Sequence, residues 1–149
     1  MRHSRPESDH LAENDDTGSA VLEFTFLGLL LLVPVVYLVL TVGAVQGASF
    51  AVVGAADQAA KVFVDSDTPE EAHWRAQQAV NLAISDFGLP TEAAGVVITC
   101  VGTCLAPGSS VTVAVDVKVP LPLIPTMPGL STAAATVDSS ATQLVERFG

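Results

Sequence analysis

The most constraining feature of this chain is a long uncharged stretch near its N-terminus. After Glu23 no Asp, Glu, Lys or Arg occurs until Asp57, and residues 24–45 read FTFLGLLLLVPVVYLVLTVGAV. As an α-helix this stretch would extend about 33 Å at about 1.5 Å per residue, enough to cross a hydrocarbon core about 30 Å thick. A transmembrane helix is therefore the first prediction from the sequence.

The composition supports this prediction and excludes several function classes. Half of the 149 residues are hydrophobic, 15% are charged, and the mean hydropathy is +0.51, which is too apolar for an ordinary soluble domain. The net charge of −10 leaves no basic patch for nucleic acid. Two cysteines and three histidines are too few for a structural zinc cluster, and no Gly-x-Ser-x-Gly, His-Glu-x-x-His or phosphate-binding glycine motif occurs. We therefore expect neither an enzyme nor a bound metal or cofactor.

The flanks of the apolar run suggest an orientation and a stalk. Residues 1–17 are mostly polar or charged, which predicts disorder. The arginines at positions 2 and 5, against Lys61 alone after the run, favour a cytoplasmic N-terminus. A helix from Ser19 to Val64 would be about 70 Å long at about 1.5 Å per residue, so its distal half would stand outside the membrane. A secretory signal peptide cleaved near Ala44 is an alternative, although its apolar region is normally shorter and follows basic residues.

Glu23, at the start of this helix, does not fit a plain anchor. A carboxylate near mid-bilayer costs roughly 2.5 to 3.5 kcal/mol, and less near the interface. The simple interpretation is that Glu23 marks the water boundary and favours the positive end of the helix dipole. The other interpretation is that this side chain has a function.

The residues around Glu23 carry a family resemblance. Gly18-Ser19-Ala20-Val21-Leu22-Glu23-Phe24 resembles the processing site of type IV pilin-like precursors, most closely the TadE-like pseudopilins of the tight-adherence (Flp-type) pilus. The leucine run at 29–32 and Pro34 continue the pattern. The resemblance implies cleavage between Gly18 and Ser19 by a prepilin peptidase, and a role in subunit assembly for Glu23, Phe24 and Pro34. Glu23 would pair with the new amine of Ser19 in a neighbouring subunit.

The resemblance also implies an organisation and a function for the whole chain. We expect an α+β membrane protein of pilin-like fold, with a cytoplasmic leader at 1–18, a transmembrane and stalk helix at 19–64, and a small exported domain at 65–149. Its partners would be the membrane, the peptidase, other pilin-like subunits and the pilus assembly platform. The further domain after the helix implies a minor subunit, in the cytoplasmic membrane or in an extracellular pilus. An uncleaved single-span surface or binding protein is the alternative.

The C-terminal half carries its own local signals. Thr68, Pro69 and Glu71 form a helix start with a capping box, and Gly88 with Pro90 marks the stop. Apolar residues at helical spacing between them predict an amphipathic helix, over Ala72, Ala76, Ala79, Val80, Ala83, Ile84 and Phe87.

Three strands are expected to form a small antiparallel sheet against this helix and the top of the stalk. Their ranges are 96–100, 111–119, where valines alternate with other residues, and a segment within 132–144. The prolines at 120, 122, 125 and 128 predict an extended connecting loop between the last two strands.

Two further short motifs predict local contacts. Cys100 and Cys104 enclose Val101-Gly102-Thr103, which predicts a local disulfide in a non-cytoplasmic domain; a metal or redox site would need further ligands or a Cys-x-x-Cys spacing. Gly43 and Gly47 form a small-x-x-x-small motif that would let another helix approach closely.

Overall fold

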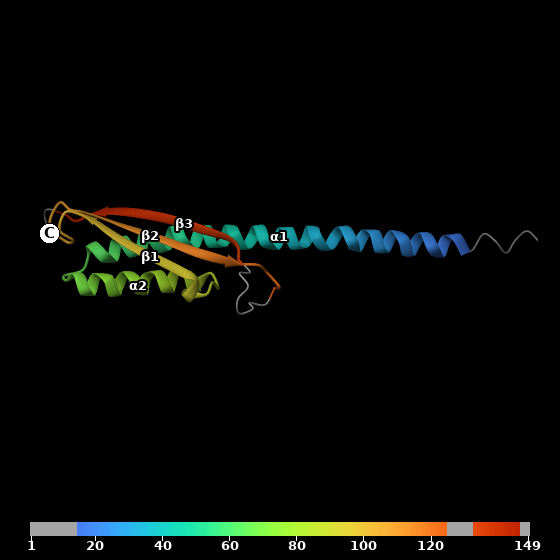
Figure 1. Cartoon of the computed structure of the whole chain (residues 1–149), viewed down its shortest axis with the longest axis horizontal. Helices are drawn as coiled ribbons and strands as arrows, with labels where there is room; N and C mark the ends of the chain where they lie inside the picture. Colours follow the sequence, from blue (N-terminus) through green and yellow to red (C-terminus); the bar gives the residue numbers. More distant parts are fainter. Residues whose placement is uncertain (1–14, 125–132, 147–149) are drawn as a thin grey trace, which may run out of the picture. The chain divides into compact units, whose positions relative to one another are not determined.

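The computed structural model describes residues 15–124 and 133–146, except the side chains of residues 15–17 and of residue 134. The elements follow in the order α1, α2, η1, β1, β2 and β3 (Figure 1). The chain divides into two compact units, Met1–Val39 (unit 1) and Leu40–Gly149 (unit 2). The fold is α+β, with one long apolar helix, a second helix and a three-stranded antiparallel sheet, as the sequence predicts.

Helix α1 spans Asp15–Val64 and includes Pro34 in its interior. Proline removes one main-chain hydrogen bond from a helix, a loss that apolar helices tolerate through local adjustment. The expected end at Val64 is confirmed, but the helix begins at Asp15, so residues 15–17 are helical rather than disordered. Each residue added to an existing helix gains one hydrogen bond without repeating nucleation. The remainder of the predicted leader, residues 1–14, lies outside the described residues.

Helix α2 spans Pro69–Asp86, and its start is the predicted one. The Thr68 hydroxyl accepts a hydrogen bond from the Glu71 amide at 3.3 Å, which satisfies one of the free donors of the first turn. In a full capping box the Glu71 carboxylate would return to the Thr68 amide, but here it accepts from Arg75 Nε at 3.1 Å.

The end of α2 depends on Gly88, whose φ is +69°. This left-handed conformation suits glycine, which has no Cβ to clash. It lets the Gly88 amide bond to the Ser85 carbonyl at 2.9 Å and the Leu89 amide bond to the Ile84 carbonyl at 3.2 Å. The two bonds form the Schellman pattern.

The sheet has the order β1-β2-β3. Strand β1 is Ala94–Val101, β2 is Ser110–Pro120 and β3 is Ala133–Leu144. Pairing puts Ile98 opposite Val113 and Val113 opposite Ala141. The ladder between β2 and β3 shifts register between Val119 and Pro120, because proline has no amide hydrogen to donate. Pro125 and Pro128 of the predicted loop lie outside the described residues.

One hydrophobic core holds unit 2 together. Alternation along β2 places Val111, Val113, Val115, Val117 and Val119 on one face, each at most 1% exposed. Helix α2 contributes side chains four residues apart, and α1 contributes a stripe that consists mainly of alanines. The helical members of the core are Ala48, Ala51, Val52, Ala55, Ala56, Ala59, Ala60, Phe63, Ala72, Ala76, Val80 and Ile84. The small alanines let α1 approach its neighbours closely.

Candidate functional site

The residues predicted for processing and assembly lie in the part of α1 that belongs to unit 1. Gly18, Ser19, Glu23, Phe24 and Pro34 are all helical and exposed. Ser19 and Glu23 are four residues apart, a spacing that brings two side chains onto the same helix face. The Gly18–Ser19 peptide bond is also helical.

This part of α1 presents large apolar side chains all around the helix. From Val21 to Val33 they are between 55% and 78% exposed. Thr25 does not break the apolar surface, since its hydroxyl donates to the Val21 carbonyl at 2.8 Å, an internal bond that satisfies a polar group within an apolar helix. Ten side chains form this surface: Val21, Leu22, Phe24, Phe26, Leu27, Leu29, Leu30, Leu31, Leu32 and Val33.

The length and composition of α1 are those of a membrane span. Among the described residues, one helical stretch, Gly18–Val64, is long and apolar enough to span a membrane. Its most apolar window has a mean hydropathy of 2.6, and none of that window is buried. Signal sequences near an N-terminus share these properties. The helix is therefore long and apolar enough to cross a bilayer.

The glycines of unit 1 have room around them. A Cβ built at Gly18 or at Gly28 meets no atom within 4 Å. Neither glycine is therefore required for packing within the described part of the chain. This makes Gly28 a matched control for substitutions at Gly18.

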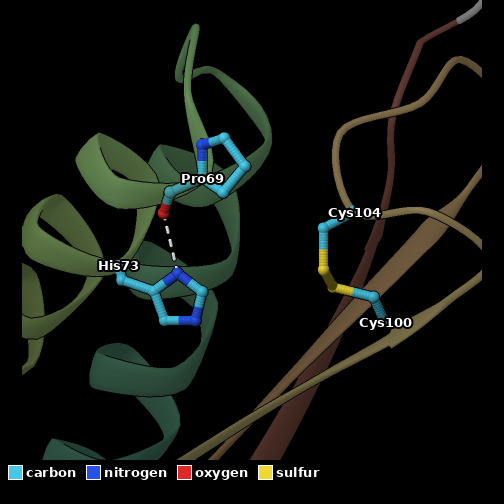
Figure 2. The surroundings of a disulfide bond; sticks show 4 residues. All are labelled: Pro69, His73, Cys100 and Cys104. Carbon is cyan, nitrogen blue, oxygen red and sulfur yellow. Dashed lines mark hydrogen bonds between the residues drawn. A yellow bond between two sulfur atoms is a disulfide. The ribbon is translucent and has the colours of Figure 1, made fainter.

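The two cysteines form the predicted disulfide in unit 2. Cys100, near the end of β1, is bonded to Cys104, with a Cα–Cα distance of 5.5 Å (Figure 2). The enclosed turn contains Gly102 at φ +91°, a conformation that favours glycine. Both cysteines are partly buried against the core. The disulfide is thus a structural link at one end of the sheet.

His73 and Trp74 on α2 have structural or surface positions. His73 Nδ1 lies 2.7 Å from the Pro69 carbonyl oxygen (Figure 2), and because that oxygen can only accept, Nδ1 carries the proton. The His73 ring meets Phe63 edge-on, with ring centroids 5.1 Å apart. Trp74 is 64% exposed. Within residues 15–124 and 133–146, no group of three or more His, Cys, Asp or Glu side chains could hold a metal ion.

An open apolar cleft of about 320 Å³ lies at the other end of unit 2. Three segments form it: one turn of α1, the C-terminal end of α2, and the chain leaving β2. No charged side chain of the described residues lines it. The lining residues are Gly43, Ala44, Gly47, Ala48, Phe87, Gly88, Leu89, Val119, Pro120, Leu121 and Pro122.

The cleft corrects one expectation from the sequence. The sequence places Phe87 on the apolar face of the second helix, but Phe87 is the C-cap of α2 and is 52% exposed. Gly47, from the small-x-x-x-small motif, borders the same ring, since a Cβ there would lie 4.0 Å from Phe87 Cδ1. One signal for the cleft was present in the sequence: no charged residue occurs between Lys118 and Asp138.

Known proteins add no further identification, because neither protein-family models, nor curated proteins, nor solved structures give a match to this chain.

Proposed function

We propose that this chain is a structural, non-enzymatic subunit of the TadE-like, pilin-like type. It inserts through α1 with its N-terminus in the cytoplasm and residues 65–149 exported. A prepilin peptidase cleaves it after Gly18, and it assembles as a minor component into, or at the base of, a tight-adherence pilus. The observation that carries the proposal is the position of Glu23, on an exposed apolar helix four residues after Ser19.

An electrostatic interaction between subunits would explain the position of Glu23. An unpaired charge within an apolar helix bundle is unfavourable by several kcal/mol, and a partner of opposite charge offsets much of that. Cleavage after Gly18 would create a positive amine at Ser19, one helical turn from the carboxylate. In a bundle of such helices, each carboxylate would meet the amine of an adjacent subunit. A lone polar group at a helix seam is a well-attested means of fixing register.

The rest of the chain is consistent with an exported subunit. The disulfide between Cys100 and Cys104 suits an oxidising, non-cytoplasmic compartment. The exposed Leu and Phe side chains around the first half of α1 suit either lipid or the neighbouring helices of a filament.

The first test replaces Glu23 by Gln in cells that contain the chain's own pilus machinery. Glutamine keeps the shape of the side chain but leaves a neighbour's amine without its counter-charge. We expect carbonate-resistant membrane insertion to be unchanged, while intersubunit cross-linking and recovery in sheared filaments fall at least tenfold. Glu23→Asp, which keeps the charge, should retain most of the assembly. Normal assembly of the Glu23→Gln variant would overturn the proposal.

The second test concerns processing and uses the two unpacked glycines. The mature N-terminus should be Ser19 in the unmodified chain, as determined by mass spectrometry. Gly18→Val should prevent cleavage, because a branched side chain beside the scissile bond obstructs the peptidase. Gly28→Val makes the same change where a Cβ is equally free of contacts and should leave cleavage unaffected.

An uncleaved single-span surface or binding protein is the second candidate. The observation that favours it is that the Gly18–Ser19 bond lies within α1, which begins at Asp15. A helical peptide bond must be unwound before a protease can hold it in extended form. This candidate requires an intact Met1 terminus in the presence of active peptidase, together with an unaffected Glu23→Gln variant.

A further inference from the structure

The cleft end of unit 2 presents apolar side chains to the outside. Phe87 is 52% exposed, Ile124 is 42% exposed and Leu123 is 84% exposed. We propose that this end of unit 2 rests on the lipid bilayer and inserts these three side chains into its interfacial layer. This inference rests on the proposed function, in which α1 spans that bilayer.

The first argument is continuity with the membrane span. Residues 40–45 belong to unit 2 and are also the last residues of the apolar run 24–45. A run of that length ends near the surface of a hydrocarbon core about 30 Å thick. Gly43 and Ala44 line the cleft together with Phe87 and Leu121. The cleft is therefore lined in part by the last residues of the apolar run.

The second argument is the conformation of the segment that follows β2. The Ile124 amide bonds to the Leu121 carbonyl at 3.5 Å, and Leu123 between them has φ +65°. A left-handed conformation is unfavourable for leucine, and backbone outliers of this kind are characteristic of functional segments. Here the turn directs the most exposed large apolar side chain of the described residues toward solvent.

The third argument is charge. From residue 119 to residue 137 the sequence contains no Asp, Glu, Lys or Arg, although the whole chain carries a net charge of −10. An acidic protein is repelled by anionic headgroups, so the attraction would come from apolar burial and not from basic residues. Aromatic rings such as Phe87 and aliphatic side chains suit the boundary between headgroups and acyl chains. The surface that fits is therefore a zwitterionic bilayer.

The opposite end of unit 2 provides the matched control. Val101, the last residue of β1, pairs with Ser110 at the start of β2, whereas the cleft includes Val119 and Pro120 at the other end of β2. Val101 is also an exposed aliphatic residue, at 73%. It is therefore an exposed aliphatic side chain at the end of the sheet away from the cleft.

The experiment measures tryptophan depth in the full chain reconstituted into phosphatidylcholine vesicles. Trp74, which is exposed, is replaced by Phe, and single tryptophans are introduced as Leu123→Trp, Ile124→Trp or Val101→Trp. With brominated phosphatidylcholine we expect the tryptophan fluorescence of the Leu123→Trp and Ile124→Trp variants to fall at least twofold relative to unbrominated vesicles. Val101→Trp should change by less than a tenth.

Three outcomes overturn the inference and separate it from the proposed function. A chain that fails to float with the vesicles, or is extracted by carbonate, contradicts membrane anchoring and therefore both proposals. A chain that remains inserted, with the tryptophans at 123 and 124 as unquenched as the one at 101, contradicts the bilayer contact alone. A concentration-dependent blue shift without bromine quenching assigns the patch to a second copy of this chain.

Discussion

Asp116 of β2 stands directly opposite Asp138 of β3 in the sheet, on the face that points away from the helices. On its other side Asp116 is paired with Gly95 of β1. A Cβ at Gly95 would collide with the Asp116 carboxylate, so the glycine leaves room for that side chain. Two like charges directly opposite each other in an antiparallel pair are destabilising.

Removing one of these charges should stabilise unit 2. We expect Asp138→Asn to raise the free energy of unfolding by about 0.5 kcal/mol, measured by urea denaturation in detergent micelles, with a gain that shrinks as salt screens the repulsion. Glu92→Gln makes the same change in net charge at an exposed position of the short η1 helix (Thr91–Ala93), outside the sheet. It should give a smaller gain. Equal gains from the two variants would show that the effect comes from net charge and not from the pair.

Thr112 and Thr142 form a favourable cross-strand pair on the same face of the sheet. They are opposite each other in the ladder, and their hydroxyl oxygens are 2.8 Å apart. A hydroxyl can both donate and accept, so such a pair is mutually satisfied where two carboxylates are not. The outer face of the sheet therefore contains both a mutually satisfied hydroxyl pair and a pair of like charges.

The β1–β2 connection depends on the link between Cys100 and Cys104. The turn around it contains Gly102 and also Leu105, whose φ of +65° is unusual for a leucine. Closing so short a loop by a disulfide lowers the conformational entropy of the unfolded chain. In the chain-entropy model this stabilises the folded state by about 2 kcal/mol.

Loss of this disulfide should weaken unit 2 without dismantling it. We expect the Cys100→Ser/Cys104→Ser double variant to lose about 2 kcal/mol of unfolding free energy, as measured by urea denaturation. The unmodified protein under reducing conditions should show a similar loss. A loss of more than about 4 kcal/mol would mean that the disulfide also organises the core, because that exceeds the entropic term for a loop of this size.

Helix α1 illustrates how one element can have two kinds of surface. In unit 2 it buries residues at spacings of three and four, from Ala48 to Phe63, while Phe50 and Val53 between them stay 72% and 55% exposed. In unit 1 its apolar residues are exposed on every side. The first pattern suits a helix that packs on one face, and the second suits a helix surrounded by lipid or by other helices.

The two units depend on different properties of the sequence. The core of unit 2 has contributions from α1, α2 and β2, whereas the apolar surface of unit 1 depends on composition alone. A substitution in the core should therefore change the stability of unit 2 and leave the affinity of α1 for a membrane unchanged.

Ile84→Ala tests this separation. Ile84 is fully buried in unit 2, and removing a buried isoleucine side chain costs about 2–5 kcal/mol of unfolding free energy. We expect a loss of that size by circular dichroism in urea, with carbonate-resistant insertion equal to that of the unmodified chain. Leu82→Ala, on the same helix at a position 64% exposed, should change stability by less than about 0.5 kcal/mol. Failure of Ile84→Ala to insert would contradict the independence of the units.

Local spacing was sufficient to predict much of this molecule. The end of α1 at Val64, the Thr68 cap, the stop at Gly88, the alternation along β2 and the disulfide each depend on residues within a few positions of one another. Such features follow from backbone geometry and side-chain periodicity, which a single sequence displays. The position of Glu23 five residues after Gly18 is also a local pattern, and its role in assembly remains a prediction.

The strand order, the identity of the alanines through which α1 contacts the core, and the cleft beside Phe87 could not be derived in this way, although the sequence predicts that the sheet packs against the end of α1. They join segments far apart in the chain, such as Gly47 with Phe87 and Leu121. Small apolar residues suit a neighbouring element, solvent and lipid almost equally. Which of these an alanine or a glycine faces therefore depends on how α1, α2 and the sheet pack together. The spacing of residues along one helix does not determine which of these environments a small residue meets. Tertiary packing determines it.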